Sequence, residues 1–279
     1  MACAAPKMRA PVRSPSSLVV ASAGWIPSTV DMPPTKKTSS PTRPRVKGSA
    51  AKAAPLEAAH RGSRRKRDTR AKLLSAALHL MAHRGVAGVA INEITQQADV
   101  GFGSFYNHFE SKEAIYATLI EEVISQYAVA LDKLGDQLPD PAEKIAASAR
   151  YTMLRGHEDP TWGRFVFQTN FSRESMTSGL GRYLLQDIGN GIAAGRLTVG
   201  DLPSVYIAVG STILGGLAAL SDQSHVGTEP DMFEDAKTLT ERLAAIILTI
   251  LGLSKEEARK VATRPLPKIE LPSNPFAAI

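Results

Sequence analysis

A short stretch of the chain, Gly103-Ser-Phe-Tyr-Asn-His-Phe109, gathers side chains that can hydrogen-bond to a nucleic acid. Its two phenylalanines stand four residues apart, so they can pack inward together and leave the polar side chains toward solvent. Serine and tyrosine can donate hydrogen bonds to phosphate, histidine can do the same, and asparagine can make a bidentate contact with adenine. The stretch therefore has the chemistry both for phosphate contact and for reading bases.

Other patterns that resemble active sites are weaker. Gly101-Phe-Gly-Ser104 follows no predicted strand and lacks the Gly-Lys-Ser/Thr ending of a phosphate loop. His79 and His83 are four residues apart, but no glutamate follows His79 and no third ligand is evident, which favours surface residues over a zinc site. No spacing supports a Ser/His/Asp set, a carboxylate pair or a cysteine nucleophile. We therefore expect no catalytic residue, no metal and no cofactor, and hence no enzyme.

The elements that position the polar stretch are short helices. Apolar residues recur every three or four positions from Thr69 and stop at Gly85, where glycine can take the left-handed conformation that ends a helix. A second helix of about two turns is expected over 91–98, and a tight connection containing glycine leads into the polar stretch. Two helices joined in this way form a helix-turn-helix, whose second helix enters the DNA major groove. Ser111 then caps a long helix, beside Lys112.

With these helices and polar residues, the chain resembles the TetR family of transcriptional regulators. The matching residues lie between 69 and 113 without a gap: Thr69-Arg70, Leu74, Ala77, Gly85, Ile94, Ala98, Val100, Phe105-Tyr-x-His-Phe109 and Lys112-Glu113. The resemblance implies a recognition helix at 102–108, with Tyr106, His108 and Lys112 on backbone phosphates. It assigns base reading to Phe102, Gly103, Ser104 and Asn107. The chain departs from the family at Ala90, where a Thr or Ser usually caps the second helix.

Charge divides the chain into two parts. Residues 1–67 hold 14 Lys and Arg and two acids, a charge of +12, whereas the remainder carries −6. The first part also has 9 of the 18 prolines and few large apolar residues, so we expect residues 1–66 to be a disordered arm. Its basic cluster, Arg61-Gly-Ser-Arg-Arg-Lys-Arg67, is either a phosphate-tracking arm or a solvated tail.

Several features bear on the compartment. Basic residues precede Ser16–Ala23, but this apolar segment is too short and too polar for a secretory signal. The single cysteine, Cys3, excludes an internal disulfide and fits a reducing setting. The apolar runs near 207–220 and 243–253 fall short of the roughly 20 residues that cross a bilayer. We expect a cytoplasmic, nucleoid-associated bacterial protein without a membrane segment, with its translation start open between Met1, Met8 and Met32.

The rest of the chain predicts helix after helix. Apolar periodicity and breaks at glycine and proline indicate helices at roughly 111–134, 141–155, 160–170, 174–195, 203–222, 231–252 and 254–263. No strand pattern is present, so the fold class is all-α. The expected domains are the arm, a DNA-binding domain at 67–114, a ligand-binding and dimerisation domain at 115–264 and a Pro-rich tail at 265–279.

Two surfaces are assigned with the help of the resemblance. The last two long helices are expected to form a homodimer interface, against the alternative of a monomer core, through Ile213, Leu217, Leu243, Ile247 and Ile250. An aromatic-rich zone is expected to line a pocket for a small-molecule effector, although core packing explains most of these residues as well: Met153, Trp162, Phe165, Phe167, Phe171 and Tyr183.

The resulting functional prediction is a repressor on a palindromic operator in double-stranded DNA, released by a small apolar or amphipathic effector. Two other classes stay open. One is a DNA-binding protein without a ligand, and the other is an enzyme or carrier that uses the same fold.

Overall fold

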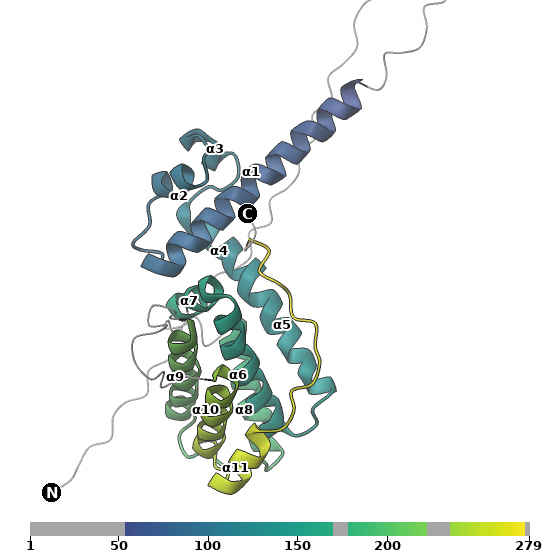
Figure 1. The fold of residues 1–279 in the computed structure, drawn as a ribbon, viewed down its shortest axis with the longest axis vertical. Coiled ribbons are helices and arrows are strands. Elements are labelled where there is room, and N and C mark those ends of the chain that lie inside the picture. Colours follow the sequence, from purple (N-terminus) through teal and green to yellow (C-terminus); the bar gives the residue numbers. More distant parts are fainter. Residues whose placement is uncertain (1–53, 170–177, 222–234, 277–279) are drawn as a thin grey trace, which may run out of the picture. The chain divides into compact units, whose positions relative to one another are not determined.

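The computed structural model describes residues 54–169, 178–221 and 235–276, and within these ranges the chain is helical without a strand (Figure 1). The side chains of residues 54–61 are not described. The elements in chain order are α1 (Ala54–Arg84), α2 (Ile91–Gln97), α3 (Phe102–Tyr106), α4 (Lys112–Leu119), the π-helix η1 (Ile120–Ser125), α5 (Gln126–Asp132), the 3-10 helix η2 (Lys133–Asp136), α6 (Pro141–Glu158), α7 (Pro160–Thr169), α8 (Gly179–Ala193), α9 (Leu202–Ser221), α10 (Ala236–Ile250) and α11 (Lys255–Ala262). The all-α prediction is confirmed.

The first three helices pack around one small apolar centre. The buried face of α1 includes Leu74 and Met81, and Ile94 of α2 and Phe105 of α3 pack against the same core. Gly85 ends α1 with φ +69°, and its amide donates to the carbonyl of Met81 at 2.9 Å. These contacts hold α2 and α3 as the predicted helix-turn-helix.

The start of α2 lacks half of its usual cap. The Glu93 carboxylate accepts the backbone amide of Ala90 at 2.8 Å and also pairs with Arg84 at 2.8 Å. Ala90 has extended backbone angles but no side-chain oxygen to accept an amide of the first turn in return. The side-chain half of this cap is therefore missing.

Restoring this cap is expected to stabilise the protein. Ala90 is exposed, so Ala90→Ser fits without a clash and should raise the free energy of unfolding by about 0.5–2 kcal/mol. The opposite change is Ser111→Ala at the start of α4, where Ser111 accepts the amide of Ala114 at 3.2 Å, and it should lower stability by a similar amount. Urea unfolding measures both. An unchanged midpoint for Ala90→Ser would show that solvent already satisfies this end.

One long helical segment connects the helix-turn-helix to the rest of the chain. Residues 112–136 run through α4, η1, α5 and η2, so the expected helix at 111–134 is present but has a π-helical turn in its middle. The indole nitrogen of Trp162 donates to the carbonyl of Val123 in this turn at 3.3 Å. Isolated π-helical turns often mark functional positions in a helix.

The remaining helices form a bundle with a second core. This core joins α6, α8, α9, α10 and α11, with Ile145, Ile188, Val209, Ile247 and Val261 among its buried members. The first core continues from α1 along residues 112–136 to Trp162 and Phe165 of α7. The predicted DNA-binding domain (67–114) and ligand-binding domain (115–264) therefore share a core, because α7 and the long helical segment pack in the same core as α1.

Two predicted boundaries are wrong. The arm was expected to be disordered to residue 66, but α1 begins at Ala54, so the basic cluster lies on a helix; residues 1–53 lie outside the described residues. The segment from 265 was expected to be a tail, yet Asn274 and Phe276 are buried against the body of the protein. Prolines prevent helix formation there, but they do not prevent packing of an extended segment.

The expectation about apolar lengths is wrong for the run near 207–220, which belongs to α9, and residues 112–136 were not considered. Residues 112–136 and α9 are each long and apolar enough to cross a bilayer by those measures alone, and 39% of each tested window is buried. Core helices of water-soluble proteins meet the same criteria.

Candidate nucleic-acid interface and ligand cavity

The polar stretch around α3 presents its side chains outward, as predicted. Phe105 is fully buried, whereas Phe102 is 53% exposed and Tyr106 is 52% exposed, with their rings edge to face at 5.6 Å. Gly103 and Asn107 are exposed as well, and Ser104 and His108 are half-buried. Two large aromatic rings that remain in water on a five-residue helix form a surface suited to a partner.

The turn before this helix holds one residue in an uncommon conformation. Asp99 has φ +52°, in the left-handed region that aspartate tolerates better than most residues other than glycine. The sequence analysis predicted a tight connection containing glycine at this position. Gly101 instead precedes α3 with extended angles, φ −65° and ψ 144°.

Lys112 lies at the start of α4 and is held by the backbone. Its ammonium group donates to the carbonyl of Val89 at 3.0 Å, which leaves further donors on the same group for a phosphate. Ser111 caps the helix beside it. Lys112 thus connects the loop before α2 to the first turn of α4, in addition to the phosphate contact predicted for it.

A basic turn of α1 lies near the polar stretch. Arg64, Arg65, Lys66 and Arg67 are all exposed. Burial lowers the pKa of His108, and the positive charges of Lys66 and Arg70 lower it further, so the basic turn acts on the recognition segment electrostatically. Arg70 itself pairs with Glu122 at 2.9 Å and stacks over Phe109, so it braces the fold.

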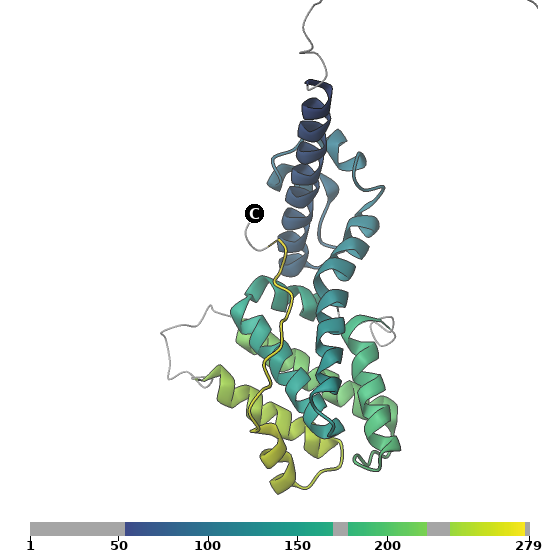
Figure 2. The ribbon, with the colours of Figure 1, turned by 90° about the vertical axis from the view of Figure 1, so that its right-hand side faces the viewer.

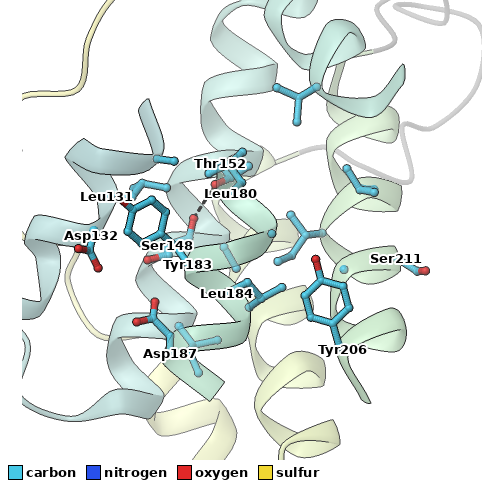
Figure 3. Close-up of a pocket in the computed structure, with 18 of the residues that line it drawn as sticks. Leu131, Asp132, Ser148, Thr152, Leu180, Tyr183, Leu184, Asp187, Tyr206 and Ser211 are labelled. Atoms are coloured by element: carbon cyan, nitrogen blue, oxygen red, sulfur yellow. Dashed lines mark hydrogen bonds between the residues drawn. The ribbon is translucent and has the colours of Figure 1, made fainter. Parts of the chain in front are cut away.

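A cavity of about 310 Å³ lies between the long helical segment and the bundle (Figure 3). Its wall is mostly aliphatic, from α5, α6, α7, α8 and α9, and includes Leu131, Ile145, Val166, Leu184 and Leu214. A few polar side chains line it too: Ser148, Thr152, Tyr183, Tyr206 and Ser211. Such a mixture of apolar wall and few polar groups is typical of small-molecule sites.

One side of the cavity carries carboxylates. Asp132 and Asp187 line it there, across from Tyr206 (Figure 3), and Lys144 bridges them at 2.9 Å and 2.7 Å. Burial raises the pKa of Asp187 despite this bridge. Burial opposes the charge on Lys144, but hydrogen bonds to both carboxylates raise its pKa overall. The cavity therefore offers strong hydrogen-bond acceptors at one side of an apolar chamber.

Most of the predicted pocket residues do not line this cavity. Tyr183 does, but Met153, Trp162 and Phe165 are fully buried core residues, and Phe167 packs against the core. Phe171 lies outside the described residues. Large aromatic side chains gain most from burial and fill the interior, which the sequence pattern does not distinguish from a pocket wall. The carboxylates were missed because Lys144 and Asp187 are far apart in sequence.

The predicted dimer interface is only partly exposed. Leu217 and Ile247 are fully buried within the chain, so they cannot touch a second copy, whereas Ile213, Leu243 and Ile250 are half-buried. The large apolar side chains that α9 and α10 expose instead include Ile246 and Ile207, and Ile207 also lines the cavity. Periodicity identified the apolar helices but not which apolar side faces inward.

Glycines distinguish the two sides of α9. A Cβ on Gly216 would lie 2.5 Å from the Met153 sulfur, because this glycine packs inside the bundle. A Cβ on exposed Gly215 meets nothing within 4 Å, whereas Gly210, which is equally uncrowded, lines the cavity. The outer side of α9 near Gly215 is therefore open.

No group of three metal-ligating side chains occurs within 54–169, 178–221 and 235–276. His79 and His83 stack with ring centres 4.6 Å apart, and Arg164 contacts His83 at 3.3 Å. A guanidinium at this position disfavours a cation beside the imidazoles.

Two family models match the chain. Residues 73–119 match the model described as bacterial regulatory proteins, tetR family, and residues 140–264 match tetracyclin repressor-like, C-terminal domain. The helix-turn-helix and the bundle with the cavity therefore each correspond to a known domain type.

Solved structures are similar over most of the chain. The crystal structure of RolR in complex with the ligand resorcinol is 32% identical, covering 75% of this chain and 100% of that one with a TM-score of 0.54. A putative tetR family transcription regulator from Shewanella sp. PV-4 is 18% identical with a TM-score of 0.55, covering 67% of this chain and 99% of that one, and it shares the fold.

Curated relatives match over shorter stretches of the chain. The repressor DhaR of Mycobacterium sp. strain GP1 is 43% identical over 56 residues, which are 20% of this chain and 28% of that protein. The repressor NemR of Escherichia coli K12 is 37% identical over 67 residues, 24% of this chain and 34% of that protein. The chain thus aligns with about a third of the length of these relatives. All are named transcriptional regulators, which confirms the prediction that the chain is not an enzyme.

Proposed function

Because the chain belongs to the TetR family of regulators, we propose that it is a cytoplasmic repressor that binds a palindromic DNA operator as a homodimer and is released by a small molecule. The observation that carries the proposal is the combination of an outward-facing recognition segment and a polar-sided cavity within one chain. The basic turn of α1 adds phosphate contacts beside the recognition segment.

The DNA contacts divide by chemistry. Tyr106, His108 and Lys112 contact phosphates, and these contacts set position without reading sequence. Asn107 and Ser104 are the polar side chains available to base edges, since α3 has no Lys or Arg. Two such segments on a symmetric dimer read half-sites about 34 Å apart.

Selection of binding sites from random duplex DNA tests this proposal. A palindromic consensus with two half-sites about one helical turn apart is the expected result. The selection is run in duplicate, with and without a metabolite extract. Recovery of DNA without any shared sequence would contradict the proposal and would favour a carrier or an enzyme on the same fold.

Asn107 and Tyr106 should respond differently to substitution. Asn107→Ala should weaken binding by about 1–3 kcal/mol at its own base pair and relax the preference there, because a bidentate base contact is lost. Tyr106→Phe removes only a phosphate donor, so it should weaken all sequences alike. Competition binding to the consensus and to single-base variants measures this. Equal losses on every duplex for Asn107→Ala would show that it contacts only the backbone.

The effector is proposed to be a small hydroxylated molecule of the phenol class. The cavity of about 310 Å³ matches a compact ligand, its wall is mainly aliphatic, and its carboxylates can accept hydroxyl protons. RolR, which is similar along its whole length, was solved with resorcinol. The ligand shifts the equilibrium only if it binds the released geometry more tightly than the DNA-bound one.

The Asp187 carboxylate should decide affinity for such a ligand. Asp187→Asn keeps the shape but removes the charged acceptor, and a hydrogen bond to a charged group contributes about 1.5–3 kcal/mol, so resorcinol binding should weaken by about tenfold or more. Tyr206→Phe, across the cavity, is the matched control and should change affinity little. Calorimetric titration gives both constants. Equal affinities for wild type and Asp187→Asn would rule out this role for the carboxylate.

A further inference from the structure

Residues 265–276, which we call the C-terminal strap, run back from α11 to the region of α1 (Figures 1 and 2). They lie outside both matched family models, which cover 73–119 and 140–264. The strap has no helix, yet it is fixed at both ends. Its contacts therefore call for an explanation apart from the DNA-binding and ligand-binding domains.

The start of the strap is attached to α6, through Arg264 directly before it and Pro267 within it. The buried guanidinium of Arg150 donates to the carbonyl of Arg264 at 2.7 Å and pairs with Glu241 at 3.0 Å. The hydroxyl of the next residue, Tyr151, donates to the carbonyl of Pro267. Three half-buried side chains of the strap then pack against the first core: Leu266, Ile269 and Leu271.

The far end of the strap is attached to α1. Phe276 is buried in the same core as the apolar face of α1, and its carbonyl accepts the hydroxyl of Ser75 at 3.2 Å. Buried Asn274 accepts the amide of Phe276 at 3.1 Å and donates to the Asp159 carboxylate at 3.0 Å. The strap thus reaches from the ligand-binding bundle to the DNA-binding domain.

Asp159 joins the strap to the start of α7. One of its carboxylate oxygens accepts the amide of Trp162 at 3.0 Å, and the other accepts Asn274. The side chain of Trp162 in turn donates to Val123 in the π-helical turn. The end of the strap, α7 and the long helical segment therefore meet at one buried cluster.

The same helix holds both the strap and the cavity wall. Ser148, Ala149 and Thr152 of α6 line the cavity, while Arg150 and Tyr151, between them in sequence, hold the strap on other sides of the helix. Any displacement of α6 by a ligand must therefore either carry the strap with it or break these hydrogen bonds.

We propose that the C-terminal strap is an interdomain latch that holds α1 in its DNA-binding position and links it to α6. Its anchors on α1 and at the start of α7 are positioning contacts, because they lie outside the recognition segment and do not line the cavity. The latch depends on the proposed function only for one of its two tests, the measurement of operator affinity.

Full-length variants Asn274→Ala and Phe276→Ala test the latch. Hydrogen exchange should become at least about tenfold faster at amides of residues 71–84 in α1, while amides of α10 stay unchanged, because a local anchor is lost without global unfolding. Affinity for the selected operator should fall about tenfold. Phe276→Leu refills most of the apolar site and should restore both properties.

Two control variants separate the latch from general stability. Ser273→Ala changes an exposed residue of the strap and should have no effect. Val261→Ala opens a void in the second core, away from α1, and should speed exchange in the bundle without selecting α1. Unchanged exchange in α1 for both Asn274→Ala and Phe276→Ala would overturn the proposal. If no operator is found, the proposed function fails, but the exchange measurement still decides on the latch.

Discussion

Replacing Ile246 by glutamate is expected to convert the protein into a monomer and to weaken operator binding by at least about 100-fold. Ile246 is 51% exposed on α10, and Gly215 is exposed on the neighbouring helix α9, where an added Cβ would meet nothing within 4 Å. A large apolar side chain that stays in water is a candidate contact for a partner, and we propose that this partner is a second copy of the chain. A buried carboxylate without a partner would prevent association.

The DNA effect follows from linking two half-sites. A dimer gains from binding its second half-site as an intramolecular event, which raises affinity by about 10²–10⁴ over a single recognition segment. Analytical ultracentrifugation measures the assembly state, and fluorescence anisotropy on the operator measures affinity. Val129→Glu is the matched control, because Val129 is 47% exposed on α5, outside the α9–α10 pair. A dimeric Ile246→Glu protein would place the interface elsewhere.

Neutralising the basic turn of α1 is expected to have the second large effect. The changed residues are Arg64→Gln, Arg65→Gln, Lys66→Gln and Arg67→Gln together. Log K falls with log salt, and each lost phosphate contact makes this slope less steep by about 0.9. Four residues on each of two protomers can therefore reduce the steepness by up to about 7. Affinity near physiological salt should fall by about 100-fold or more, while the preferred sequence stays the same.

A second neutralised variant controls for net charge. Lys255, Arg259, Lys260 and Lys268 are exposed in or after α11, which lies at the end of the bundle away from α3 (Figure 1). Changing these four to glutamine alters the net charge equally, so only position differs. Equal losses of operator affinity for the two variants would show that net charge attracts the DNA at long range and that α1 makes no phosphate contacts of its own. A changed consensus for the α1 variant would show that the basic turn also reads bases.

The helical basic turn changes how these contacts work. A disordered arm loses conformational entropy when it binds, whereas side chains on a preformed helix start from fixed backbone positions. The proximity of Lys66 to His108 places this turn next to the recognition segment. We therefore expect footprints to extend outward from each half-site by a defined distance.

The sequence alone determined the elements whose signals are local. Apolar spacing and glycine positions predicted helices such as 160–170, found as Pro160–Thr169, and the helix-turn-helix with its exposed polar residues. Such signals depend on neighbours three or four residues away. They also carried the family resemblance, because the matched residues lie within one short segment.

The tertiary structure decided everything that depends on which side of an element is covered. On α9, Leu217 is buried in the core while Ile207 is exposed, and on α10 Ile247 is buried while Ile246 is exposed. In sequence, all four are apolar residues of apolar helices. The carboxylate side of the cavity forms only when α6 and α8 meet, and Phe276 reaches α1 only after the whole chain has folded back. Contacts between residues distant in sequence leave no periodic signal, and so the cavity, the exposed apolar side chains and the strap could be identified only in the folded chain.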